Sequence, residues 1–322
     1  MSQSNADIIK KADITIGDLA ANGGLLNPEQ TNTFIVNMIN QPTILNMARV
    51  VTMGAPTYKV NKIGFGGRIL RKATSVTAVA ENDRAKPITS QVELQSKEII
   101  AEVRIPYDVL EDNIEGGNIN AAQAQGNAGG LMNTILTMIA ERAALDLEEW
   151  ALRGDTSLAG TDAYLGMNDG WLKLAAAGGH TGGFTLGKMS KDAVKTNILA
   201  LPTQYLRNRA VMRNFMSYAN ETELRDTYAA RQTALGDNNL QNSQDITVFG
   251  TKVTPAALMP ENKVLFTNPL NLLFGIQRKV TIEYEKSIRT REFIIVLTLR
   301  CDAQIEEDDA TVLLTGTAPV GP

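Results

Sequence analysis

The segment LMNTILTMIAERAALDLEEWALR, residues 131–153, carries the strongest helical pattern of the chain. Apolar residues recur every third or fourth position, as on one face of an α-helix, at Leu131, Ile135, Met138, Ile139, Leu145 and Leu152. At about 1.5 Å per residue, this segment would span roughly 35 Å. The pattern predicts a long helix over residues 119–153, with a break or kink in its glycine-bearing first third, because glycine disfavours the helix.

Upstream of this helix, residues 51–107 have the alternating pattern of β-strands. Val92 and Leu94 alternate with polar residues, and the residues from Ile99 to Ile105 alternate again after a shift of phase near Glu98. Such a shift predicts a bulge or a bend. Two strands joined by a long polar tip hold too little apolar mass to fold alone. We therefore expect a long hairpin that depends on contacts outside itself.

The N-terminal part is predicted to be an irregular arm, residues 1–27, followed by a helix from Asn27 to Gln41. Asparagine is a favoured N-cap, and Pro28 occupies the first helical position, where proline is tolerated. Pro42 ends this helix, since proline cannot continue it.

After residue 153 the chain is rich in glycine to about residue 190, which predicts mostly loop. A second unit follows, with Asn220 as the expected N-cap of its second helix and a polar stretch over residues 231–245. Its helices are expected over Lys191–Leu206 and Glu221–Tyr228, and its strands over Val280–Tyr284, Glu292–Cys301 and Ala310–Leu314. The strand that ends at Cys301 is apolar on both faces, which predicts burial within a sheet.

The composition of the 322 residues, 43% hydrophobic and 20% charged, is typical of a globular protein. No apolar run reaches the length of about 18 residues that spans a bilayer, so no membrane contact is expected. One cysteine excludes an intramolecular disulfide framework and fits a reducing cytoplasm. The 31 basic and 35 acidic side chains leave a net charge of −4, without the basic surplus of most proteins that grip nucleic acid. The locally basic segment Lys59–Lys72 is interpreted as an exposed loop or a surface that contacts a neighbour, with a nucleic-acid site as the alternative.

Four features could carry chemistry. Residues 182–189 have the glycine and lysine spacing of a phosphate-binding loop, but Met189 stands where that loop needs Ser or Thr, so a surface loop is expected. His180 is the single histidine, and the sequence places no nucleophile or metal ligand beside it. Cys301 alternates with apolar residues and is predicted to be a buried thiol. The acidic run 306–309 is interpreted as a solvated turn, with weak cation binding as the alternative. We therefore predict no catalytic, cofactor-binding or metal site, and a protein that is not an enzyme.

The order of segments resembles the major capsid proteins of tailed bacteriophages, the Hong Kong 97-type fold. The order is arm, helix, long hairpin, long helix, and then a mixed unit of sheet and helices, from about Asn27 to Gly316. Local matches lie at Phe215–Arg225, Thr247–Val253, Met259–Pro260, Leu272–Gly275, Arg300–Ala303 and Asp309–Ala310. The family's "leucine-glycine-x-proline-valine" passage lacks its proline here, where Lys252 stands.

This resemblance implies a map of the chain. Residues 1–50 would form the arm and first helix, residues 51–107 the extended loop that lies over a neighbouring subunit, and residues 190–285 the axial domain. The peripheral domain, with the long spine helix, would comprise residues 108–189 and 286–322. The stretch 231–245 would be the loop near the axis of the capsomer.

The resemblance also implies partners. Copies of the chain would form pentamers and hexamers that close into an icosahedral shell around double-stranded DNA, contacted weakly and without specificity. Only 27 residues precede the first predicted helix, which implies a separate scaffolding protein or a segment outside this chain. A portal and a decoration protein are further expected partners, and assembly is expected in the bacterial cytoplasm. The alternatives are an encapsulin-like compartment shell and an unrelated enzyme or binding protein.

Overall fold

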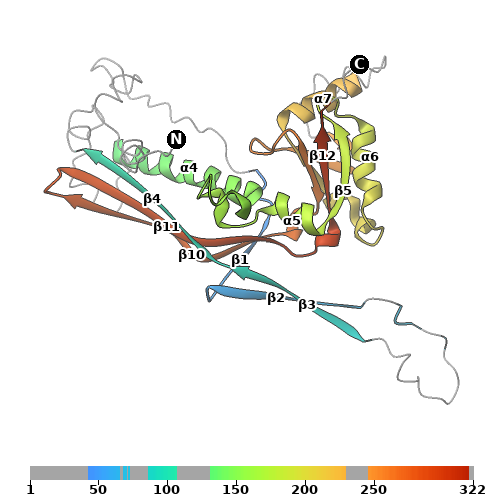
Figure 1. The fold of residues 1–322 in the computed structure, drawn as a ribbon, viewed down its shortest axis with the longest axis horizontal. Coiled ribbons are helices and arrows are strands. Elements are labelled where there is room, and N and C mark those ends of the chain that lie inside the picture. Colours follow the sequence, from blue (N-terminus) through green and yellow to red (C-terminus); the bar gives the residue numbers. More distant parts are fainter. Residues whose placement is uncertain are drawn as a thin grey trace.

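The computed structural model of the protein describes residues 43–65, 68–70, 72, 86–106, 131–229 and 246–318. Their strands form three sheets, of four, six and two strands. Figure 1 shows the four-stranded sheet beneath a long helix, the six-stranded sheet with its own helices, and the two-stranded hairpin reaching away from both. This mixed architecture confirms the predicted α+β class.

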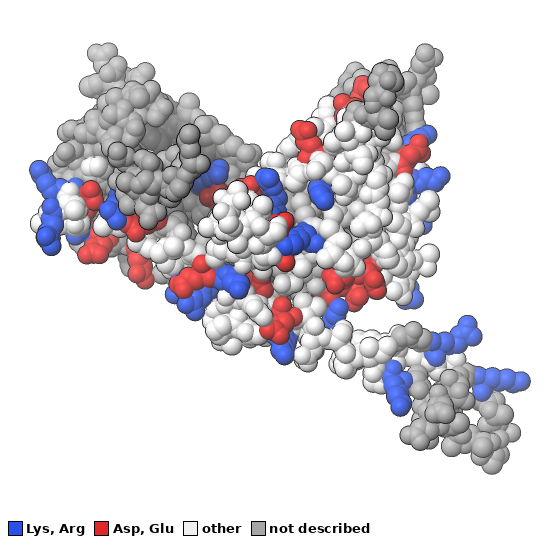
Figure 2. Space-filling view, in the orientation of Figure 1, with Lys and Arg blue, Asp and Glu red and all other residues white. Residues whose placement is uncertain are grey.

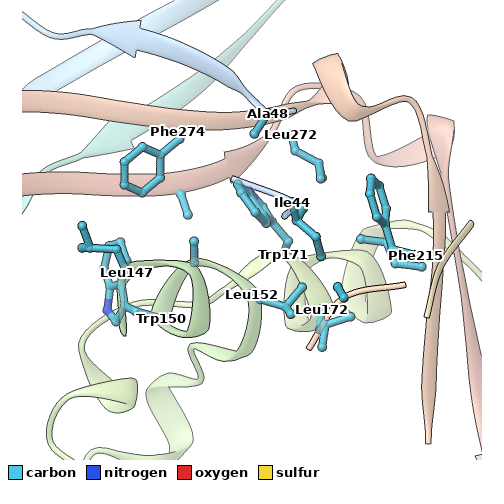
Figure 3. Close-up of a cluster of buried hydrophobic side chains, with 14 of the residues drawn as sticks. Ile44, Ala48, Leu147, Trp150, Leu152, Trp171, Leu172, Phe215, Leu272 and Phe274 are labelled. Carbon is cyan, nitrogen blue, oxygen red and sulfur yellow. The ribbon is translucent and has the colours of Figure 1, made fainter. Parts of the chain in front are cut away.

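The four-stranded sheet lies against the long helix α4 (Leu131–Arg153). Its strands, in spatial order, are β1 (Arg49–Thr52), β10 (Leu272–Ser287), β11 (Glu292–Ile305) and β4 (Lys97–Pro106). Every second residue of β11 from Phe293 to Cys301 is buried, because that face meets α4. Figure 3 shows Leu147 and Trp150 of α4 facing Phe274 of β10. The predicted helix is confirmed from Leu131 onward, while residues 119–130 lie outside the described residues.

The six-stranded sheet forms the second half of the molecule. In spatial order its strands are β5 (His180–Thr185), β12 (Thr311–Thr317), β9 (Lys263–Thr267), β6 (Arg213–Met216), β8 (Thr251–Pro255) and β7 (Thr247–Val248). Residues of α6 (Lys191–Ala200) and α7 (Tyr218–Ala229) pack on this sheet around Met216, Phe266 and Leu314.

The short helix α5 (Trp171–Gly178) lies where the two larger sheets meet. Its Trp171 is completely buried, and the indole Nε1 donates to the carbonyl of Gln304, 3.1 Å away. One continuous apolar cluster contains Trp171, Leu297 of β11 and Phe215 of β6, so it belongs to both sheets. Five further short segments are 3-10 helices, at Thr156–Leu158, Leu165–Met167, Tyr205–Val211, Pro269–Asn271 and Asp308–Ala310.

The hairpin consists of β2 (Thr57–Phe65) and β3 (Pro87–Gln95), paired antiparallel. The predicted bend near Glu98 is confirmed and lies at Ser96, where the chain leaves β3 and enters β4 of the four-stranded sheet. The predicted hairpin segment 51–107 is thus divided between two sheets. The reason is burial, because Ile99 and Ile105 of β4 pack into the main core and most of β3 is exposed.

Several predicted boundaries in the second unit were wrong. The helix expected to reach Leu206 ends at Ala200, because Pro202 disfavours helical geometry at Leu201, which is extended. The stretch 154–190, predicted to be mostly loop, contains α5 and β5. The strand expected over Val280–Tyr284 is part of the longer β10.

The second helix of this unit begins earlier than predicted. Helix α7 starts at Tyr218, and the Ser217 hydroxyl accepts a hydrogen bond from the Asn220 backbone N–H, 3.3 Å away. Ser217 is therefore the N-cap, while the buried Asn220 side chain donates to the carbonyl of Glu261. Other predictions lie outside the described residues, namely the arm and helix of residues 1–41, the hairpin tip at 81–85 and the polar stretch 231–245.

The N-cap assignment can be tested with Ser217→Ala. This substitution removes an acceptor for the first turn of α7 and should lower the free energy of unfolding by about 1 kcal/mol. The urea unfolding midpoint measures the change. Thr222→Ala, on the exposed side of the same helix, should change it by less than about 0.5 kcal/mol. Equal effects of the two substitutions would contradict the assignment.

A second prediction concerns the turn after α4, where Asp155 accepts hydrogen bonds from Lys173 Nζ (2.7 Å) and the Ser157 backbone N–H (2.8 Å). The Lys173 hydrogen bond is the main cause that lowers the pKa of Asp155 to about 2. An unfolded aspartate titrates near about 3.9, so the stabilisation is complete above that pH and is lost as the pH falls through about 2.

Asp155→Asn should therefore be less stable than the wild type at pH values well above about 4, with a gap that narrows in acid. Thermal unfolding across the acid range measures this gap. Lys173→Met should weaken the same pH dependence, since it removes the main cause of the pKa shift. A gap of constant size in acid would refute the assignment.

Candidate interaction surface

The base of the hairpin is packed into the core. Leu94, near the end of β3, is completely buried, and it lies with Met53 against Gly275 of β10. A Cβ atom on Gly275 would lie 2.7 Å from the Met53 sulfur, so a larger residue here would require the Met53 side chain to shift. The Ser96 hydroxyl also donates to Gln277 Oε1, 2.6 Å away. These contacts fix the point from which the hairpin leaves the body.

A buried carboxylate fastens the same base. Asp302 of β11 is 1% exposed and accepts hydrogen bonds from the backbone N–H of Gln95 (2.6 Å) and from the Asn168 side-chain amide. Burial raises the pKa of Asp302, and the donated hydrogen bonds oppose this shift. This role of Asp302 was not predicted from the sequence. An acidic side chain within the apolar central strand was the signal that could have found it.

A second buried carboxylate holds the chain ahead of β1. Glu148 of α4 is 2% exposed and accepts hydrogen bonds from the backbone N–H groups of Thr43 (2.7 Å) and Ile44 (3.0 Å). Burial is the main cause that raises the pKa of Glu148. Sequence patterns could not find this contact, because a glutamate on a helix is ordinary and its partners lie more than a hundred residues away.

The rest of the hairpin exposes apolar side chains. Ile63 is 74% exposed and Ile88 59% exposed, and Phe65, Ile69 and Leu70 are also exposed. Scattered exposed apolar residues are normal, but a group of them on one two-stranded element marks an interaction surface. The register places Ile63 and Phe65 on one face of the two strands and Ile88 on the other. Together the five residues, on both faces, are called the hairpin patch.

The hairpin patch has basic neighbours. Lys59, Lys62, Arg68, Lys72 and Lys86 lie on the described part of the hairpin, where the acidic residue is Glu93. Figure 2 shows several basic side chains around this end of the molecule. A basic, apolar surface fits an acidic, apolar partner.

Such a surface exists on the face of the four-stranded sheet that points away from α4. Ile294 and Val296 of β11 are half-buried there, and Ile100 of β4 is 65% exposed. On the neighbouring strands, Glu283 lies opposite Val296, and Glu102 on its other side pairs with Arg104. This set is called the sheet patch. Strand β11 lies inside the sheet between β10 and β4, as predicted, and its second face is half-buried because helix α4 covers only the first.

One end of the sheet patch carries an ion triad. The Glu98 carboxylate accepts from Arg300 Nη2 at 2.7 Å and from Arg278 Nη2 at 2.9 Å. The Arg300 hydrogen bond is the first of the causes that lower the pKa of Glu98. The triad joins β4, β10 and β11 close to the hairpin base.

The structure places the glycine-rich stretch, His180 and Cys301, which the sequence had marked as candidates for chemistry. Gly182 and Gly183 lie in strand β5, so the stretch 182–189 is partly strand and was wrongly predicted to be all loop. His180 begins β5 and pairs in register with Val312. Cys301 is a buried free thiol, as predicted, and burial raises its pKa. Among the described residues, no three His, Cys, Asp or Glu side chains are grouped so as to hold a metal ion.

The acidic run 306–309 is not simply a solvated turn. Glu306 forms an ion pair with Arg49 of β1, and Glu307 forms one with Lys62 of the hairpin.

In the described part of the chain, no helix is long and apolar enough to cross a membrane.

Comparisons with known proteins agree with this architecture. The model of the phage capsid family matches residues 22–316. The prophage capsid protein YqbE of Bacillus subtilis (strain 168) is 40% identical over 318 residues, which cover 95% of this chain and 96% of that protein. The similarity thus extends over nearly the whole of both chains.

Solved structures share the fold. The capsid of a native GTA particle has a TM-score of 0.65 at 18% identity, with 93% of this chain and 98% of that chain covered. A chain of the satellite phage P4 procapsid has a TM-score of 0.61 at 14% identity, with 99% of each chain covered. The SrpI encapsulin of Synechococcus elongatus PCC 7942 is more distant, with a TM-score of 0.51 at 12% identity over 94% of this chain and 96% of that one. This chain therefore belongs to the phage capsid family and is a major capsid shell protein, with a structural and not an enzymatic role.

Proposed function

We propose that copies of this chain assemble through pentamers and hexamers into an icosahedral shell that encloses double-stranded DNA. The observation that carries the proposal is the hairpin, which is anchored at its base and exposes its apolar residues beyond it. No other described residue buries them, so a second molecule is the proposed source of their burial. A head-to-tail contact between identical copies closes into a ring when the rotation between copies is right, and rings then tile a shell.

The proposed contact is between the hairpin patch of one copy and the sheet patch of its neighbour. Ile63 and Ile88 on one side, and Ile100 on the other, supply apolar area. In this contact the basic Lys86 of the hairpin would meet acidic side chains of the sheet patch such as Glu283. Burial of apolar area stabilises such a contact by roughly 25 cal/mol per Å². The charged side chains determine the relative orientation of the two copies more than the affinity between them.

We assign the domains by sheet membership. The peripheral domain comprises α4 and the four-stranded sheet, to which β4 and β10 belong, and the axial domain comprises the six-stranded sheet with α6 and α7. This assignment differs from the map by residue ranges, which placed β5 and β12 in the peripheral domain. By sheet membership both strands belong to the axial domain. The extended loop is reduced to the hairpin of β2 and β3.

The further partners follow from the same proposal. They are a separate scaffolding protein, a portal and a decoration protein, with assembly in the bacterial cytoplasm. DNA would be enclosed with weak, non-specific contact. The net charge of −4 supports this, as do the interspersed acidic and basic side chains on the face seen in Figure 2.

Electron microscopy of the purified chain tests the assembly, alone and with a scaffolding partner. Shells, tubes or capsomer rings are expected. A small discrete oligomer under all conditions would refute the proposal. The contents of particles from cells separate a phage shell, which holds nucleic acid, from an encapsulin-like compartment, which holds a cargo protein.

A matched pair of substitutions tests the hairpin. Ile88→Asp adds a charge to the exposed patch and should block assembly while changing the free energy of unfolding by less than about 0.5 kcal/mol. Leu94→Asp, on the same strand, buries an unpaired charge and should destabilise the subunit by several kcal/mol. Urea unfolding and particle yield are measured for both.

Deletion of residues 67–87 should likewise leave a folded subunit that does not assemble. Normal particles from Ile88→Asp would contradict the proposed contact. If the deletion unfolded the subunit, the distal hairpin would belong to the core.

A further inference from the structure

The chain passes between the peripheral and axial sheets three times, and two of these passages are short and lie side by side. One runs from β9 to β10 through residues 268–271, and the other runs from β11 to β12 through residues 306–310. Asn271 binds them together, because its side-chain amide donates to the Glu307 carbonyl (2.9 Å) and its side-chain oxygen accepts from the Glu307 N–H (2.8 Å). The backbone N–H of Glu306 also donates to the Asn271 carbonyl, 2.9 Å away. These two segments are called the joint.

Lys62 of the hairpin reaches the joint. Its Nζ donates to the backbone carbonyl of Glu306 (2.5 Å) and to Glu307 Oε2 (3.2 Å). The side chain of Lys62 is 23% exposed, whereas that of Lys59 on the same strand is 55% exposed and pairs with Glu93 inside the hairpin. Lys62 thus bridges two parts of the molecule, and Lys59 does not.

The surroundings make this contact more than a loose surface ion pair. Exposed pairs contribute about 0–1 kcal/mol. Here, however, the Lys62 side chain is about three-quarters buried, and one of its acceptors is a backbone carbonyl in a segment that is hydrogen-bonded to Asn271. Arg49 of β1 also reaches Glu306, at 2.9 Å, so cations from two elements meet at the joint.

We infer that Lys62 is a positioning residue that couples the direction of the hairpin to the joint between the two sheets. The base contacts at Leu94 and Asp302 fix where the hairpin starts, and a second attachment further along β2 fixes its direction. A change in the angle between the sheets moves the joint, and Lys62 transmits that movement to the hairpin.

The consequence for the shell rests on the proposed contact between hairpin and neighbour. A head-to-tail contact closes into a ring only when the rotation between copies suits it, and the hairpin direction contributes to that rotation. Loss of the Lys62 contact therefore leaves subunits able to associate but lowers the uniformity of the particles. Loss of the hairpin patch instead prevents association.

The test measures the hairpin direction in the full-length chain. Spin labels on Thr89→Cys in the hairpin and Lys195→Cys on α6 report the distance between these elements, and the buried Cys301 does not compete for label. A single narrow distance distribution is expected in the otherwise unaltered protein. Lys62→Met, which keeps the apolar stem but removes the charge, should abolish the narrow peak, and Lys59→Met should retain it.

A narrow peak retained in Lys62→Met would overturn the inference. Unfolding midpoints of both variants show that the fold is intact, since neither residue lies in the core. Electron microscopy adds an independent readout, in which Lys62→Met should yield particles of mixed size and shape. Ile88→Asp should keep the narrow peak but fail to assemble, so a failure of the coupling is distinguishable from a failure of the proposed contact.

Discussion

The structure depends on the burial of one face of β11 beneath α4. Phe293, Ile295, Leu297 and Leu299 all point to that face and are at most 2% exposed. Leu297 and Leu299 belong to the apolar cluster that also holds Trp150 and Trp171, and truncation of such large buried side chains typically costs about 3–5 kcal/mol. Because this core reaches Phe215 in the six-stranded sheet, it joins the two halves of the subunit.

Two extended segments of the chain are attached to the core through buried carboxylates. Glu148 accepts hydrogen bonds from the segment ahead of β1, and Asp302 accepts one from the end of the hairpin. Burial of a charge is costly unless hydrogen bonds satisfy it, and both groups accept from backbone N–H donors. Such bonds are directional, so they fix where each segment leaves the core. This geometry suits a shell subunit, whose extended parts must meet neighbours at a defined angle.

The hairpin itself has the opposite character. Its base is as buried as the core, yet beyond it Ile63, Phe65 and Ile88 are open to solvent. A two-stranded element has no second layer to cover such residues. The body of the subunit is therefore well packed, whereas its hairpin leaves apolar side chains exposed, and this is the observation behind the proposed contact between copies.

Some features could be predicted from sequence because they depend on local periodicity. The helix from Leu131 to Arg153, the buried strand around Cys301 and the bend between β3 and β4 all follow from spacing along the chain. The order of these segments was enough to suggest the family. Helix ends were less certain, since Ser217 and Asn220 are equally good caps by residue type, and only the backbone geometry selects Ser217.

Other features were decided by tertiary structure. Sequence spacing could not place β4 in the four-stranded sheet and β3 in the hairpin, because both alternate and only burial against α4 separates them. Nor could it pair Lys62 with Glu307, Gln95 with Asp302 or Ile44 with Glu148, whose partners are remote in the chain. The sequence by itself determined the order of the long helix, the buried strand and the hairpin, since these follow from local patterns, but it missed α5 and β5. Only the folded chain decided which sheet each strand joins and which charges meet, because those choices depend on contacts between distant residues.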